Sequence, residues 1–275
     1  EKKKTYFTPR IVISLPRENE YLIKQYSLLR KWQSKYQELK YTIVGIDFCG
    51  YEEPFPPIGK KEFFRTVKKD NKNAKHYPLT ILYHVGESFE KITLASSIRW
   101  IWQTHEFGAD RLGHTISLGI NTQGLINTEY RESIRERRDH LQWLINQENR
   151  LKKNGFEVKK TSCLKELNEL KTKSDNELLE GLYTREMCDE LHCLQEAIMK
   201  ELSTKGAVIE VCPSSNMMIA KLELRKSLTI NRFIKASMNI IVSSDDPGIF
   251  ATNLSNELKL CKQSGLSEFE IAKIC

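Results

Sequence analysis

The sequence predicts an α/β protein in which parallel strands alternate with helical crossovers. Short apolar or β-branched runs recur along the 275 residues, and most are followed by a loop and a longer amphipathic segment. Several of these runs are apolar throughout, as expected for strands that are buried on both faces. A hydrophobic content of 40% is sufficient for a core.

Six segments are predicted to be strands because apolar and β-branched residues cluster there in short runs. They are Ile11–Leu15, Thr42–Asp47, Leu79–Val85, Asp110–His114, Ala207–Cys212 and Asn239–Ser243. Helices are predicted between them, where apolar residues recur at helical spacing. They are Glu20–Lys40, Ser88–Phe107 and Ser227–Ser237.

The interval between the fourth and fifth strands is too long for an ordinary crossover. About 90 residues separate His114 from Ala207, whereas a crossover with its helix needs far fewer. We therefore expect residues 116–205 to form a helical insertion between two parts of the sheet domain, 1–115 and 206–275. Capping residues and helical spacing predict three helices within it. They run from Thr128 to Asn154-Gly155, over Leu164–Leu170, and from Thr184 to Lys205-Gly206.

Composition narrows the class of protein. No apolar run approaches the roughly 20 residues of a membrane helix, and the chain opens with Glu-Lys-Lys-Lys instead of a signal peptide. Seven scattered cysteines without a C-x-x-C pair predict reduced thiols and a cytoplasmic location. The net charge of +7 is typical of a solvated surface and does not by itself predict a nucleic-acid partner. The first residue is Glu and not Met, which is consistent with a fragment.

Four polar clusters lie at the carboxyl ends of predicted strands, where parallel α/β barrels place their catalytic groups. Taken alone, each has an ordinary explanation, such as a histidine near a solvated acid or an Asp in a turn. Taken together, they offer imidazoles and carboxylates for a metal, and Glu210 within an apolar strand needs a partner. The clusters are HVGE (84–87), RLGH (111–114), EVCPSSN (210–216) and SSDDP (243–247).

This series of motifs, in this order, resembles that of the adenosine deaminase family. The segment Gly45–Glu52 resembles the same family's G-x-D-x-x-G-x-E motif. The resemblance covers residues 8–114 and 206–275, and it implies a TIM-type (β/α)8 barrel. It also implies zinc-dependent hydrolytic deamination of adenosine or a related 6-aminopurine nucleoside, with one Zn²⁺ per site, to an inosine-type product and ammonia.

The resemblance also implies roles for particular residues. His84 and Asp245 match zinc ligands, and His114 matches the residue that takes the proton of the attacking water. Glu87 matches the acid that protonates purine N1, so its carboxyl must stay protonated beside the substrate. The remaining matches are substrate contacts at Gly50 and Asp246, and supporting positions at Glu210 and Ser215 that hold His114 in orientation.

One part of the family pattern is absent from this chain. Family members carry a His-x-His pair at the end of the first barrel strand, and no such pair occurs here. The six predicted strands resemble the family's third to eighth, so about six of eight barrel strands are present. We expect two further zinc ligands from an absent N-terminal segment or a companion chain, and we expect the isolated chain to be incomplete and inactive.

The other histidines do not replace the absent pair. His76 is expected in a loop, and His105, His140 and His192 lie in predicted helices. Cys188 and Cys193 flank His192, but neighbours on a helix point in different directions, so a helical surface or core is favoured over a zinc site.

Two alternative functions remain open. Asp-Asp-Pro-Gly-Ile-Phe resembles the nucleoside branch of the family more closely than the AMP deaminase branch, which makes a nucleotide deaminase the weaker match. In a different class, the long insertion favours a structural or assembly subunit that keeps the barrel as a scaffold. The large deaminase-domain subunits of phage-defence assemblies are similar in outline. Oligomer contacts would then involve the insertion.

Overall fold

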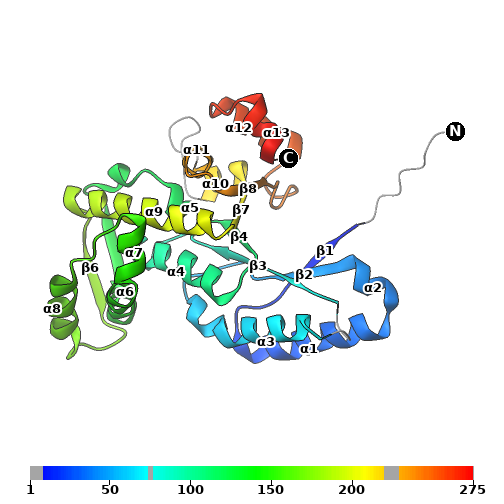
Figure 1. Ribbon diagram of the computed structural model, residues 1–275, viewed down its shortest axis with the longest axis horizontal. Coiled ribbons are helices and arrows are strands. Elements are labelled where there is room, and N and C mark those ends of the chain that lie inside the picture. Colours follow the sequence, from blue (N-terminus) through cyan, green and yellow to red (C-terminus); the bar gives the residue numbers. More distant parts are fainter. Residues whose placement is uncertain (1–8, 74–76, 220–228, 275) are drawn as a thin grey trace.

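The computed structural model describes residues 9–73, 77–219 and 229–274. Its centre is one sheet of six parallel strands (Figure 1). The strands are β1 (Ile11–Ser14), β2 (Ile43–Asp47), β3 (Thr80–Val85), β4 (Arg111–His114), β7 (Val208–Val211) and β8 (Asn239–Val242). All six predicted strands are therefore confirmed, and each end lies within one residue of its prediction.

The sheet has the order β1-β2-β3-β4-β7-β8, so the strands of this sheet follow one another in chain order. Parallel strands in sequential order, joined by crossovers, are the pattern of a β/α barrel. Among the described residues, β1 and β8 each pair on one side only, so the barrel is open between them. The fold is a partial β/α barrel, as predicted.

The helices of the N-terminal half differ from the predicted ranges. The predicted helix Glu20–Lys40 is divided at Tyr36, which has extended backbone. Residues 88–91 stay outside the next predicted helix because the Glu53 carboxylate binds the Ser88 hydroxyl and the N–H groups of Glu90 and Lys91. The helices are α1 (Asn19–Lys35), α2 (Gln37–Thr42), α3 (Lys61–Asn71), which was not predicted, and α4 (Leu94–Phe107).

The C-terminal helices follow β7 and β8. The predicted helix Ser227–Ser237 is observed as Ile230–Lys235, and its residues 227 and 228 lie outside the described residues. The helices are α10 (Pro213–Ile219), α11 (Ile230–Lys235), α12 (Leu254–Gln263) and α13 (Glu268–Ile274). No helix of the described residues is long and apolar enough to cross a membrane.

The segment 116–205 contains a β-hairpin as well as helices. Residues 129–133 pair antiparallel with residues 178–182, so the prediction of a helix beginning at Thr128 was wrong. The Thr128 hydroxyl donates to the carbonyl of Leu125, and Ser133 caps the helix that starts at Ile134. The elements are α5 (Ile116–Gly119), β5 (Glu129–Ser133), α6 (Ile134–Asn146), α7 (Glu148–Asn154), α8 (Lys160–Leu170), β6 (Leu178–Leu182) and α9 (Arg185–Thr204).

Helix α9 belongs to the sheet domain by its packing. It lies against α4 and leads directly into β7, so it occupies the place of a crossover helix between the paired strands β4 and β7. Its N-cap is Thr184, as predicted, and Gly206 with φ 72° follows its end. The hairpin and helices α6 to α8 lie on the far side of α4 and α9 from the sheet (Figure 1).

Candidate active site

Three side chains from separate strands converge at the carboxyl end of the sheet. They are His84 on β3, His114 on β4 and Asp245, which follows β8. One ligand atom from each lies within 4.8 Å of the others. The two imidazole rings have centroids 4.9 Å apart. The structure thus brings together three of the residues predicted for metal binding and catalysis.

His84 is oriented by an aspartate on the neighbouring strand. Its Nδ1 lies 3.1 Å from Oδ1 of Asp47, which leaves Nε2 free to face the cluster. Burial alone would lower the pKa of His84, but the hydrogen bond and charge of Asp47 outweigh it and raise that pKa. Asp47 belongs to the G-x-D-x-x-G-x-E segment, but sequence reasoning gave it no role.

His114 is buried and held from behind by an amide. Its Nδ1 lies 2.8 Å from Oδ1 of Asn216. On the other side, Nε2 lies 3.3 Å from Oε1 of Glu87 and 3.9 Å from Oδ2 of Asp245. Gly113 permits this packing because a Cβ there would lie 3.1 Å from the His84 ring. The imidazole therefore faces both carboxylates in one orientation.

Two of the convergent residues have strained backbone. His114 has φ 60° and Asp245 has φ 53°, in the left-handed region that side chains other than glycine rarely adopt. Such residues persist only where surrounding structure fixes them, and they concentrate at functional sites. The strain points to this strand end as the site of chemistry.

The loop that carries Glu87 is anchored by a buried carboxylate. Glu52 accepts hydrogen bonds from the N–H groups of Gly86, Glu87 and Ser88, each at 2.9 Å. Burial raises the pKa of Glu52 to about 7, although these hydrogen bonds oppose the shift. Glu52 is the last residue of the G-x-D-x-x-G-x-E motif, and its structural role is to hold the loop that carries Glu87.

A buried arginine joins the ends of β2 and β3. The Arg17 guanidinium donates to the carbonyls of Phe48 at 2.8 Å and His84 at 2.7 Å, and it lies over the Tyr83 ring. Sequence reasoning missed Arg17 because it stands alone in a loop, far in the sequence from the groups that it binds.

Glu210 and Ser215, which were predicted to support His114, make no described contact to its ring. Glu210 pairs with Arg111 at 3.1 Å, which supplies the partner that its apolar strand demanded. Ser215 is fully buried, and its hydroxyl has no hydrogen-bond partner among the described residues. The described contact to Nδ1 of His114 is made by Asn216, which lies six residues beyond Glu210 in the same EVCPSSN motif.

The predicted substrate contacts lie at the same end of the sheet. Gly50 follows β2 with φ 77° and has open space where a Cβ would stand. Asp246 follows β8 and its side chain is exposed. Neither residue has a described contact to the convergent histidines, so both stay predictions.

The remaining histidines and cysteines form no second metal cluster within the described residues. Cys188 is buried in α9, whereas His192 and Cys193 are exposed on it, so they face apart as expected. None of the six described cysteines forms a disulfide. His76 lies outside the described residues.

Comparison with known proteins shows similarity to one family of enzymes. Residues 160–275 match the family model described as adenosine deaminase, and this match begins inside the predicted insertion. The adenine deaminase of Rhizobium leguminosarum is 36% identical over 75 residues, which are 27% of this chain and 23% of that protein. The aminodeoxyfutalosine deaminase of Streptomyces coelicolor is 30% identical over 78 residues, 28% of this chain and 20% of that protein.

Solved structures share the fold. A zinc-bound amidohydrolase from Burkholderia ambifaria gives a TM-score of 0.52 at 12% identity, over 96% of this chain and 49% of that chain. Arabidopsis ADAL in complex with IMP gives 0.51 at 16% identity, over 96% and 51%. The chain thus spans about half the length of these structures. The shared fold is that of a β/α barrel. By sequence, the chain is similar to metal-dependent purine deaminases of the adenosine deaminase family.

Proposed function

We propose that the protein, in its complete form, deaminates adenosine or a related 6-aminopurine nucleoside by hydrolysis, releasing ammonia and an inosine-type product. The observation that carries this proposal is the convergence of His84, His114 and Asp245 beside Glu87, at the catalytic end of a barrel of this family. We further propose a cytoplasmic location.

The donor set fits a zinc ion. Imidazole nitrogens and a carboxylate oxygen are its usual ligands, and catalytic zinc commonly keeps one position open for water. When bound, zinc would supply a water of lowered pKa as the nucleophile. His84 and Asp245 would hold the ion, and two further ligands are proposed from a segment outside this chain.

The chain's own residues would move the protons. Asn216 fixes the His114 ring so that Nε2 faces the convergent carboxylates, where it can accept the proton of the attacking water. Glu87 lies within 3.3 Å of that nitrogen and would deliver a proton to purine N1. Glu210, through its ion pair with Arg111 on the strand that carries His114, and Ser215, next to Asn216, would support this arrangement. Gly50 and Asp246 would contact the purine edge.

Ammonia release by the full-length protein tests the proposal. We expect Glu87→Gln and Asp245→Ala each to lower kcat by at least about a thousandfold, because they remove the proton donor and a metal ligand. Glu90→Gln is the matched control, since Glu90 is an exposed carboxylate on the same loop and should keep full activity. Unchanged turnover in either of the first two variants would refute the assignment.

The substrate is tested by comparing adenosine, adenine and AMP. The sequence Asp-Asp-Pro-Gly-Ile-Phe favours the nucleoside, whereas the curated relatives include adenine deaminases. We expect adenosine to have the highest kcat/KM. A higher value for AMP would assign the protein to the nucleotide branch.

A scaffold is the second candidate, and exposed apolar side chains favour it. Leu164, Leu178 and Leu182 lie in segment 116–205 and are each more than half exposed, at 52%, 55% and 54%. Surfaces of this kind suit subunit contacts. Stoichiometric zinc in the complete protein would support the enzyme, and stable oligomers without zinc would support the scaffold.

A further inference from the structure

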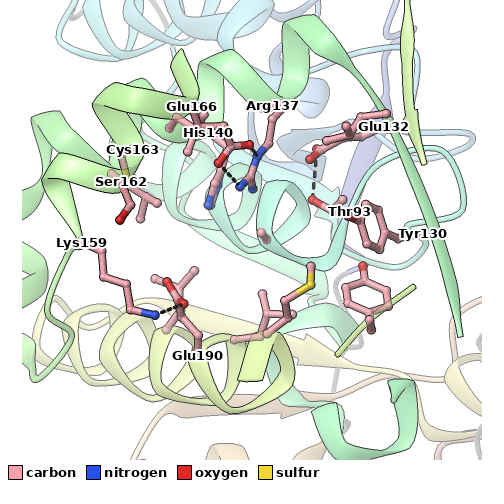
Figure 2. A pocket seen from close by; sticks show the side chains of 18 of the residues that line it. Thr93, Tyr130, Glu132, Arg137, His140, Lys159, Ser162, Cys163, Glu166 and Glu190 are labelled. Atoms are coloured by element: carbon pink, nitrogen blue, oxygen red, sulfur yellow. Dashed lines mark hydrogen bonds and ion pairs between the residues drawn. The ribbon is translucent and has the colours of Figure 1, made fainter. Parts of the chain in front are cut away.

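A cavity lies in segment 116–205, apart from the convergent histidines. It has a volume of about 480 Å³ and is enclosed by the β5–β6 hairpin, helices α6, α8 and α9, and the start of α4. Figure 2 shows it from close by. Pockets for small molecules commonly measure about 300–1,000 Å³. No residue predicted for deaminase chemistry lines it.

The walls of this cavity are mainly apolar. Leucines from α6 and α9 face a phenylalanine, a methionine and two tyrosines. The side chains are Leu141, Leu144, Leu191, Leu194, Phe156, Met187, Tyr130 and Tyr183. Such a lining favours a ligand with a large apolar or aromatic surface.

The charged groups around the cavity are paired with one another, with one exception. Arg137 donates to both carboxylate oxygens of Glu166, at 2.6 and 2.8 Å, and Lys159 donates to Glu190 at 3.0 Å (Figure 2). These pairs leave no spare cation for an anionic ligand. The exception is Glu132, which forms no described ion pair and whose charged form is disfavoured because burial raises its pKa.

Glu132 is fully buried, and only one of its two carboxyl oxygens has hydrogen-bond partners among the described residues. Its Oε2 accepts from the hydroxyls of Thr93 at 3.0 Å and Ser96 at 2.7 Å. Its Oε1 accepts from no described residue. A buried acceptor without a donor is costly, so this oxygen selects a molecule that brings an N–H or O–H group.

His140 presents a second unpaired atom in the same lining. It is 3% exposed, and its Nδ1 has no partner among the described residues. Burial holds the pKa of His140 well below 6.5, and the nearby Arg137 and Arg99 add to the shift. The ring is therefore neutral at pH 7 and adds no charge to the cavity.

We propose that this cavity binds a small, uncharged aromatic molecule that donates a hydrogen bond to Oε1 of Glu132. Its volume suits one or two fused rings with substituents, and its apolar walls and paired charges favour a neutral ligand. His140 supplies a second polar contact to a substituted ring.

Indole and benzofuran test the proposal on the chain as it stands. The two molecules have nearly the same shape, but indole has one N–H donor where benzofuran has an ether oxygen. Isothermal titration at pH 7.5 is expected to show saturable binding of indole at least tenfold tighter than benzofuran. Sites built around a buried polar group discriminate by this much or more against a ligand that leaves the group unpaired.

Glu132→Gln replaces the unpaired acceptor of residue 132 with a hydrogen-bond donor. The Gln carbonyl can still accept from Thr93 and Ser96, so its amide NH₂ stands where Oε1 stood. We expect this variant to lose the preference for indole, while Glu129→Gln, an exposed change on the same strand, keeps it.

Circular dichroism checks the fold of each variant. Leu194→Phe narrows the cavity and should weaken the binding of both indole and benzofuran. No saturable binding, equal binding of the two probes, or an unchanged preference in Glu132→Gln would show that the cavity holds water only.

Discussion

Asn216 is the residue whose contact most directly controls the orientation of His114. Its side chain is buried with 1% exposure and reaches Nδ1 of the imidazole from a position 102 residues further along the chain. Removing it would free the ring to rotate away from Glu87. Groups that orient a catalytic histidine commonly contribute about 10- to 100-fold.

If the proposed deamination is correct, we expect Asn216→Ala to lower kcat of the full-length protein by about 10- to 100-fold with little change in KM. Asn216→Asp keeps an acceptor at Nδ1 and should recover most of the rate, with a shifted pH profile. Asn231→Ala is the control, because Asn231 binds a carbonyl far from the site, that of Ser264. Equal losses in Asn216→Ala and Asn216→Asp would contradict an orienting role.

His140 should make stability depend on pH. Its pKa is far below the value of about 6.5 that it takes in the unfolded chain, so below that pH the unfolded state binds a proton that the folded state excludes. The contribution of neutral His140 to the free energy of unfolding is present above pH 6.5 and is lost as the pH drops below this value. At pH 5.5 the loss is about 1 kcal/mol.

Urea unfolding at pH 7.5 and 5.5 measures this effect. The parent chain should lose about 1 kcal/mol more between the two pH values than His140→Gln does. His192→Gln, an exposed change on α9, should behave like the parent. A parent and a His140→Gln variant with parallel pH dependence would refute the depressed pKa.

Among the elements, α4 begins at a threonine whose hydroxyl makes two hydrogen bonds. Thr93 accepts from the N–H of Ser96 as N-cap and donates to the buried Glu132. Thr93→Val keeps the shape and removes both bonds, so we expect a loss of about 1–3 kcal/mol. Thr184→Val removes the exposed N-cap of α9 and should cost about 1 kcal/mol or less. Equal losses in urea unfolding would mean that the bond to Glu132 contributes nothing.

The sequence predicted elements where a local pattern suffices and missed those that depend on distant partners. The six strands are continuous apolar runs or end in recognisable motifs, and their ends were predicted within one residue. The hairpin strands EYRES and LLEGL are short and mixed in polarity, so only their pairing reveals them. Likewise, the motifs located His84, His114 and Asp245, but nothing local shows that Arg17 binds the carbonyl of His84.

For the whole molecule, the open sides of the sheet should govern association. Strands β1 and β8 have one partner each among the described residues, and Ile11 on β1 is 44% exposed. Unpaired strand edges with apolar side chains promote pairing between chains. The 275-residue chain should therefore associate as its concentration rises.

Ile11→Lys places a charge on the β1 edge, a change that natural sheets use to prevent such pairing. We expect it to reduce the association seen by light scattering, because strand pairing would then bury a lysine. Ile58→Lys is the matched control, with a comparable exposure of 43% away from the sheet edge. If both variants associate like the parent, contacts elsewhere on the molecule are responsible.

Helix α4 joins the segment 116–205 to the barrel along its length. Its start binds Glu132, Trp100 in its middle donates to Glu136 at 3.1 Å, and Glu106 near its end pairs with Arg150 at 3.0 Å. The strand ends that carry the histidines share none of these contacts. A substitution in α4 would therefore disturb the cavity and the barrel together, whereas a substitution elsewhere in the cavity lining would leave the contacts of His84 and His114 in place.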